Sequence, residues 1–141
     1  MVYSTECYNV RQEKRSGMRV FKTRMFARWA DKEGVSDAAL LTAMDEISRG
    51  LIDANLGGHV FKKRVGIGGR GKSGGVRTLL AFRVGDRAFF VFGFAKNERS
   101  NVSDKELETL KRLASQLLGY DARELREALS TGKLYEVESD G

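Results

Sequence analysis

Residues 59–99 decide the fold, and their sequence is HVFKKRVGIGGRGKSGGVRTLLAFRVGDRAFFVFGFAKNER. The stretch holds ten Lys or Arg and two acidic residues, a net charge of +8, whereas residues 1–58 carry +1 and residues 100–141 carry −3. Solubility alone does not require so much positive charge in one short stretch. The stretch therefore predicts a surface that binds phosphate. Three runs in it are alternating or rich in β-branched and aromatic residues, which predicts three antiparallel strands at His59–Val65, Val76–Val84 and Arg87–Phe94.

Alternation along the first strand separates its basic residues from its apolar ones. Lys62 and Arg64 share one face, and Phe61 and Val65 share the other. We expect the apolar face to be buried and the basic face to be open. The alternative is a solvated basic face without a function.

The other two strands carry aromatic residues and a turn signal. Gly85-Asp86 predicts a two-residue hairpin turn between them. Alternation places Phe90, Phe92 and Phe94 on one face of the last strand. These rings are mostly expected in the core, with one of them exposed for stacking on a base.

The flanking regions predict helices. Residues 1–17 are polar without a period and are expected to be a flexible lead-in, followed by a strand at Arg19–Lys22. Thr23 and Ser36 are N-cap residues for helices at 23–33 and 36–49. These helices should cover one side of the sheet, so that the opposite, concave face carries the basic residues.

The C-terminal part begins with a capping box. Ser103 and Glu106 predict a helix over 104–118, packed near the end of the sheet. A shorter helix and a possible last strand follow within 119–141. The whole chain therefore predicts an α+β fold with one main domain over 18–118.

The glycine-rich segment Gly66–Gly75 matches the P-loop pattern G-x-x-x-x-G-K-S. A P-loop needs a helix that starts at its Lys-Ser, because the first amides of that helix bind the phosphates. The strand-like run that follows argues against such a helix and against a nucleotide cofactor. A mobile hairpin loop is one alternative, and a loop whose Arg70 and Lys72 bind an RNA backbone is another.

Composition narrows the function classes further. The 141 residues are 41% hydrophobic and 31% charged, with a pI near 9.6, which predicts a globular protein with a polyanionic partner. Cys7 is the only cysteine and His59 the only histidine, so an intrachain disulfide is excluded and a His-based metal site is not expected. No apolar run is long enough for a membrane helix and no signal peptide is evident, so we expect a cytoplasmic protein.

Three local strings resemble the RelE/ParE toxin superfamily, and specifically its HigB-like branch. They are GG…FKKRV at 57–65, GKSGGVR at 71–77 and FGFAKNE at 92–98. The resemblance runs from Arg19 to about Leu118 and includes the order of the expected elements.

The resemblance implies the toxin of a type II toxin–antitoxin system. Such a toxin inhibits translation by cutting mRNA in the ribosomal A site, and its partner is an antitoxin, typically a helix-turn-helix protein in the HigB-like branch. Family members cleave without a metal or another cofactor, through attack of the 2′-OH on the adjacent phosphate. Gyrase inhibition, as in the ParE branch, and a non-catalytic nucleic-acid-binding module are the alternatives.

The resemblance also implies which residues form the site. Phe82 and Phe94 stand where tyrosines are common in the family, so the resemblance leaves proton transfer to lysine. The catalytic candidates are Lys62, Arg64, Arg77 and Lys96, and the RNA-binding candidates are Lys63, Arg70, Lys72, Ser73 and Asn97.

Overall fold

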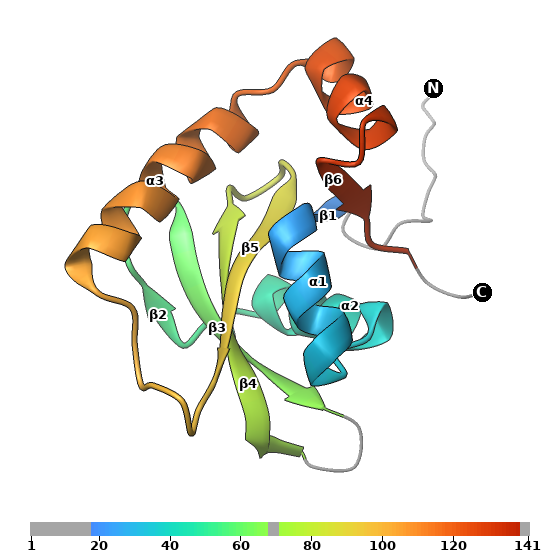
Figure 1. Ribbon diagram of the computed structural model, residues 1–141. Coiled ribbons are helices and arrows are strands. Elements are labelled where there is room, and N and C mark those ends of the chain that lie inside the picture. The colour runs from blue at the N-terminus through green and yellow to red at the C-terminus, as the bar shows by residue number, and fades with distance from the viewer. Residues whose placement is uncertain (1–17, 68–70, 139–141) are drawn as a thin grey trace.

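The computed structural model describes residues 18–67 and 71–138, so the predicted lead-in at 1–17 lies outside the described residues. One mixed sheet is covered by α1 and α2 on one face and by α3 and α4 on the other (Figure 1). The predicted α+β fold is confirmed. The elements in chain order are β1 (Val20–Thr23), α1 (Arg24–Glu33), α2 (Asp37–Ser48), β2 (Ala54–Asn55), β3 (Val60–Ile67), β4 (Gly71–Phe82), β5 (Ala88–Ala95), α3 (Asp104–Leu118), α4 (Ala122–Ser130) and β6 (Leu134–Glu136).

The sheet has the strand order β2-β3-β4-β5-β1-β6. β3, β4 and β5 form the predicted antiparallel meander. β1 pairs in parallel with β5, and β6 pairs antiparallel to β1. The short strand β2, which pairs with β3, was not predicted, because two residues are too few to show a period.

The first two helices begin and end at the residues that the sequence indicates. The side-chain oxygen of Thr23 accepts a hydrogen bond from the amide of Phe26, and that of Ser36 accepts one from the amide of Ala39. Gly34 ends α1 in the left-handed region at φ 82°, which glycine adopts without strain. The two helices thereby place their apolar sides on one face of the sheet.

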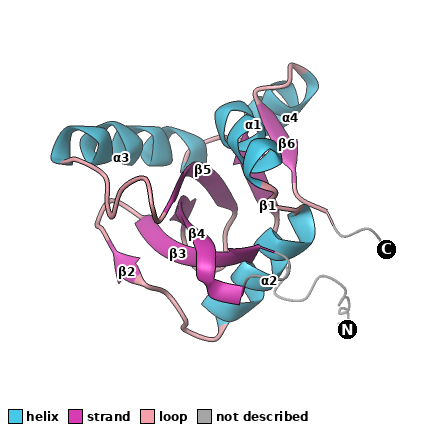
Figure 2. Ribbon diagram, turned by 60° about the horizontal axis from the view of Figure 1, so that its bottom comes forward, coloured by secondary structure: helices cyan, strands magenta, loops and turns pink. Residues whose placement is uncertain are grey.

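The opposite face is covered over part of its area by α3. The capping box of Ser103 and Glu106 starts α3, and Leu110, Ala114 and Leu117 are buried against the sheet. Figure 2 shows α3 on one side of the strands and α2 on the other. Both α4 and β6 join the hydrophobic cluster beneath α3, so the chain after α3 shares the core of the rest.

A β-bulge in β5 changes the face of its aromatic residues. Neighbouring residues of β4 pair with Phe92 and with Phe90, which leaves Val91 as an extra residue. Phe90 therefore packs against α1, and Phe92 and Phe94 lie on the other face. The prediction that all three rings share one face was wrong, because it assumed unbroken alternation.

The predicted two-residue hairpin at Gly85-Asp86 was also wrong. The last pair of β4 and β5 is Phe82 with Ala88, so the connection is the five-residue segment 83–87. A hydrogen bond from the amide of Asp86 to the carbonyl of Arg83, 2.9 Å long, closes this turn.

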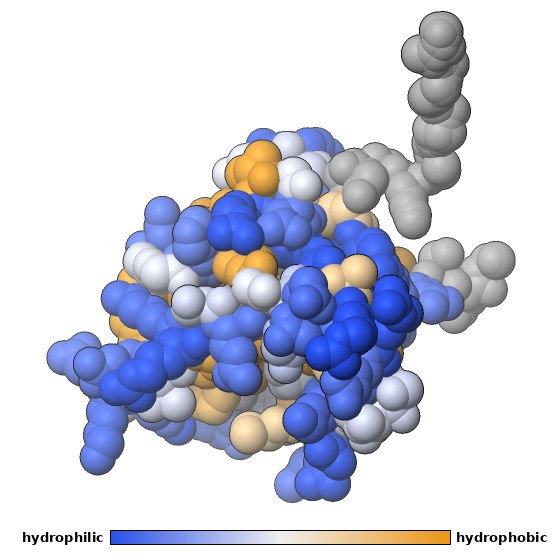
Figure 3. Space-filling model, turned by 90° about the horizontal axis from the view of Figure 1, so that it is seen from above, coloured by the Kyte–Doolittle hydropathy of each residue, from blue (hydrophilic) through white to orange (hydrophobic). Residues whose placement is uncertain are grey.

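The surface of the described residues is mostly polar. Figure 3 shows one face on which hydrophobic side chains occur in small groups between hydrophilic ones. Within 18–67 and 71–138, no helix combines the length and apolar character that crossing a bilayer requires. The large hydrophobic residues that are exposed are Met25, Leu51, Val84 and Tyr135.

Candidate active site

Three of the predicted catalytic residues lie on one face of the sheet, beside α3. Lys62 and Arg64 come from β3, and Arg77 comes from β4 directly opposite Arg64. Lys62 pairs with Leu79, which is buried in the cluster beneath α3. We call the surface formed by Lys62, Arg64, Arg77, Phe92, Phe94 and Arg99 the basic face.

Arg64 and Arg77 place two positive charges directly opposite each other on the basic face. Like charges directly opposite each other on neighbouring strands destabilise a sheet. The Nε of Arg64 lies 3.8 Å from the carboxylate of Asp53, which balances part of this charge. The Nη1 of Arg77 is buried and has no hydrogen-bond partner among the described residues. The side chain of Arg64 is 46% exposed, so a bound anion could reach the pair there and offset its remaining positive charge.

Aromatic rings form the floor of the basic face next to Arg77. Phe94 is buried directly across from Arg77, and the ring of Phe92 lies 6.2 Å from that of Phe94. The guanidinium carbon of Arg99 lies 5.6 Å from the centroid of Phe92 and 5.9 Å from that of Phe94. Both distances are within the range of cation–π attraction.

An ion pair holds Arg99 in this position. Its Nη1 lies 2.7 Å from Oε1 of Glu106, at the start of α3. The hydrogen bond from Arg99, followed by the backbone hydrogen bond from Ser103, lowers the pKa of Glu106 from 4.5 to about 2. The same hydrogen bond raises the pKa of Arg99. Both groups are therefore charged at neutral pH.

Lys63 lies on the other face of β3, which corrects its prediction as an RNA-binding residue. Its side chain is 4% exposed, and its Nζ lies 2.9 Å from Oε1 of Glu46 in α2. Because its neighbours Lys62 and Arg64 face the opposite side, alternation requires that Lys63 point into the layer between the sheet and α2. A buried, paired ammonium group does not reach an RNA backbone.

Lys96 and Asn97 follow the end of β5. Both are exposed in the turn after Ala95, two and three residues beyond Phe94. This location is next to the part of the basic face that Arg77 and Phe94 form. The turn is closed by the amide of Glu98, which donates to the carbonyl of Ala95 over 3.0 Å.

The glycine-rich segment is mostly strand. Ile67 pairs with Gly71, so residues 66–67 of the predicted loop Gly66–Gly75 belong to β3 and residues 71–75 belong to β4. Residues 68–70, which include the predicted contact Arg70, lie outside the described residues. Lys72 and Ser73 lie within β4. No helix starts at them, as predicted from the strand-like run that follows.

Arg99 and Glu106 were not predicted as parts of the site, and Phe92 was predicted only as one of three rings of which one would stack on a base. Arg99 belongs to the basic stretch, but its contact with Glu106 spans a turn and has no local period. Glu106 was assigned only to its capping box, and it fulfils that function as well. Among the residues that the structure describes, no three His, Cys, Asp or Glu side chains come close enough to hold a metal ion.

Comparison with protein families gives a match over residues 18–137. The matching model is described as the RelE toxin of the RelE / RelB toxin-antitoxin system. It extends from β1 through β6, beyond the Leu118 limit of the resemblance in the sequence strings. A search among curated proteins gave no match.

Proposed function

The chain belongs to the RelE toxin family of toxin–antitoxin systems, and from this premise we propose that it is a ribosome-dependent mRNA endoribonuclease of the HigB-like branch. The observation that carries the proposal is the pairing of Arg64 with Arg77 on neighbouring strands, with the side chain of Arg64 46% exposed. Such a pair suits a phosphate group, because guanidinium groups bind phosphate oxygens through two parallel hydrogen bonds.

The proposed reaction needs only the RNA and the side chains of the basic face. The ribose 2′-OH attacks the adjacent phosphorus, the bond from phosphorus to the 5′-oxygen breaks, and the products are a 2′,3′-cyclic phosphate and a 5′-OH. Arg64 and Arg77 stabilise the extra negative charge of the phosphorane. Arginine does not release its proton in proteins, so lysine is the better proton carrier. We assign proton transfer to Lys62 and Lys96.

The aromatic floor is proposed to position the base next to the scissile phosphate. Phe92 is half-buried and offers a ring surface for stacking beside Arg99. Asn97 follows directly after Lys96 and is exposed, which supports its proposed role in RNA binding. For Arg70, Lys72 and Ser73, contact with the RNA backbone stays a prediction.

The biological setting of the proposal follows from the family. An antitoxin is the partner of a RelE-family toxin, and we propose that here it is a helix-turn-helix protein. The chain would act on translating ribosomes in the cytoplasm, with mRNA in the A site as its substrate.

The decisive experiment measures mRNA cleavage on ribosomes together with thermal melting. Arg77→Ala and Lys96→Ala should each lower cleavage about a hundredfold, since loss of one group that stabilises the transition state costs roughly 3 kcal/mol. Both should melt like the parent. Phe82→Ala is the matched control for folding: Phe82 is buried, so this change should cost about 3–5 kcal/mol of stability.

The other outcomes separate the alternatives. If Arg77→Ala and Lys96→Ala cleave like the parent, these residues are not catalytic. RNA binding without cleavage by the parent would favour the non-catalytic module. Inhibition of gyrase supercoiling without any effect on mRNA would favour a ParE-like function.

A further inference from the structure

Arg99 leaves one edge of its guanidinium group free. Its Nη1 donates a hydrogen bond to Oε1 of Glu106, and its guanidinium carbon lies over the rings of Phe92 and Phe94. Among the residues that the structure describes, Nε and Nη2 of Arg99 have no hydrogen-bond partner, and the side chain is 40% exposed. The N–H groups of Nε and Nη2 lie side by side, so this edge can bind two neighbouring acceptors at once.

Arg19, far from the basic face, shows how the same edge is used for structure. It too lies over a ring, with its guanidinium carbon 5.0 Å from the centroid of Phe21. Its Nε and Nη2 both donate to the carboxylate of Glu136, over 2.9 and 2.7 Å. The two-donor edge of Arg19 is therefore occupied, whereas Arg99 binds its carboxylate through Nη1 and keeps that edge for a ligand.

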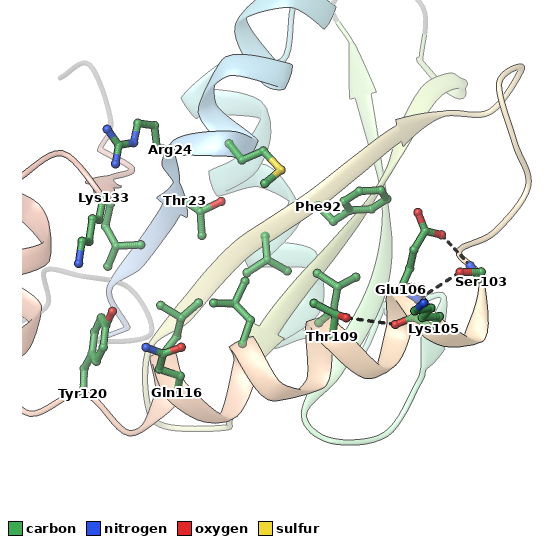
Figure 4. Close-up of a pocket in the computed structure, with 16 residues that line it drawn as sticks. Thr23, Arg24, Phe92, Ser103, Lys105, Glu106, Thr109, Gln116, Tyr120 and Lys133 are labelled. Atoms are coloured by element: carbon green, nitrogen blue, oxygen red, sulfur yellow. Dashed lines mark hydrogen bonds between the residues drawn. The ribbon is translucent and has the colours of Figure 1, made fainter.

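Glu106 determines which edge of Arg99 stays free. Its Oε1, which binds Arg99, also accepts a hydrogen bond from the backbone amide of Ser103, over 2.8 Å. Figure 4 shows this contact at the start of α3, with Phe92 on the facing strand. Because the carboxylate is bound to the cap of a helix, it holds Nη1 of Arg99 in place and leaves Nε and Nη2 available.

The surroundings of this edge fit a nucleotide base. The half-buried ring of Phe92 lines an open cavity of about 630 Å³ that extends along α3, so a base stacked on this ring has room beside it. Arg77 pairs with Phe94 on the same face, and a phosphate bound by Arg64 and Arg77 would bring a neighbouring base toward the rings. Aromatic rings favour a base over a second phosphate, because they stack on bases.

We propose that Arg99 recognises a guanine next to the scissile phosphate, with Glu106 as its positioning residue. Guanine presents two acceptors side by side, O6 and N7, and arginine binds them through two hydrogen bonds. Adenine carries an amino group in place of O6, so one N–H of Arg99 would face another donor. The inference rests on the proposed function for its substrate, single-stranded mRNA, and does not depend on cleavage.

The test measures binding of the full chain to short single-stranded RNAs that differ in one base. The probes are uridine hexamers with guanosine, inosine, 7-deazaguanosine or adenosine at one central position, 2′-O-methylated so that they cannot be cleaved. Inosine keeps both O6 and N7, whereas 7-deazaguanosine lacks N7. The parent chain should bind the guanosine and inosine probes about tenfold more tightly than the other two.

Three variants assign this preference to the free edge of Arg99. Arg99→Lys should abolish the preference and keep the affinity for the adenosine probe, because lysine has the charge but not the two-donor edge. Glu106→Gln should reduce the preference at unchanged affinity for the adenosine probe, whereas a merely structural role of Glu106 would weaken all probes alike. Arg19→Lys is the matched control, since Arg19 also combines a ring with a carboxylate, and it should keep the preference.

Cleavage on ribosomes, with guanosine or adenosine in the A-site codon, is measured in parallel. The proposal is overturned if the parent binds the four probes alike or binds none of them, if 7-deazaguanosine binds like guanosine, or if Arg99→Lys keeps the preference. Cleavage by the parent without a guanine preference at any codon position would remove the guanine assignment alone. A guanine preference in binding without any cleavage would remove the ribonuclease proposal alone.

Discussion

Lys62 and Lys63 are neighbours in the sequence, yet they should fail in opposite ways when replaced by alanine. Lys63 is buried and paired with Glu46 at 2.9 Å, so Lys63→Ala leaves a buried carboxylate without that counter-charge. Such a loss costs about 3–5 kcal/mol. In a domain of this size each kcal/mol corresponds to about 3–5 °C in Tm, so we expect a decrease of roughly 10–25 °C. Lys62→Ala should melt like the parent and lose mRNA cleavage.

A double replacement tests the reason for this difference. If the cost in Lys63→Ala comes from the uncompensated charge of Glu46, then Lys63→Met combined with Glu46→Leu should recover most of the lost stability. Thermal melting and ribosomal cleavage are measured for all variants. A Lys63→Ala protein that melts like the parent but does not cleave mRNA would refute the assignment, because it would place Lys63 in the site and not in the core.

Two further predictions concern single contacts. Gly93→Ala should lower stability by about 1–3 kcal/mol in denaturant melts, because its Cβ would overlap the ring of Trp29, and that side chain or α1 would have to shift; an unchanged midpoint would contradict this packing. Glu106→Gln keeps the capping hydrogen bond but loses the charge that pairs with Arg99. Because the pKa of Glu106 is lowered from 4.5 to about 2, the parent should melt above the variant at neutral pH, with the gap closing as the pH falls from 4.5 toward 2; a gap independent of pH would refute the ion pair as its cause.

Much of the fold could be predicted because its signals are local. The N-caps Thr23, Ser36 and Ser103 start helices where expected, since a capping side chain and the amide that it binds are three residues apart. Alternation along β3 gave the correct faces for Lys62 and Arg64. The parallel pairing of β1 with β5 is a contact between distant segments, and no local pattern encodes it.

The candidate site was predictable only in part, for the same reason. Period-two alternation predicted that Lys62 and Arg64 share a face, but the family resemblance was needed to add Arg77. The same alternation, applied to Lys63, would have placed it on the buried side of β3. Lys63 was predicted to bind RNA because it is basic, although its position on β3 indicates that its side chain is buried.

The bulge at Val91 determines which side chains of β5 lie beside the basic residues of β3 and β4. With unbroken alternation, Phe92 and Phe94 would follow Phe90 to the face of α1, and Arg77 would pair with Gly93, which has no side chain. The extra residue turns both rings toward Arg77 and brings them under Arg99. A bulge re-aims side chains at the cost of one unpaired ladder position. Basic and aromatic side chains therefore occur on the same face because one residue of β5 is out of register, and the proposed binding of single-stranded RNA would use this combination.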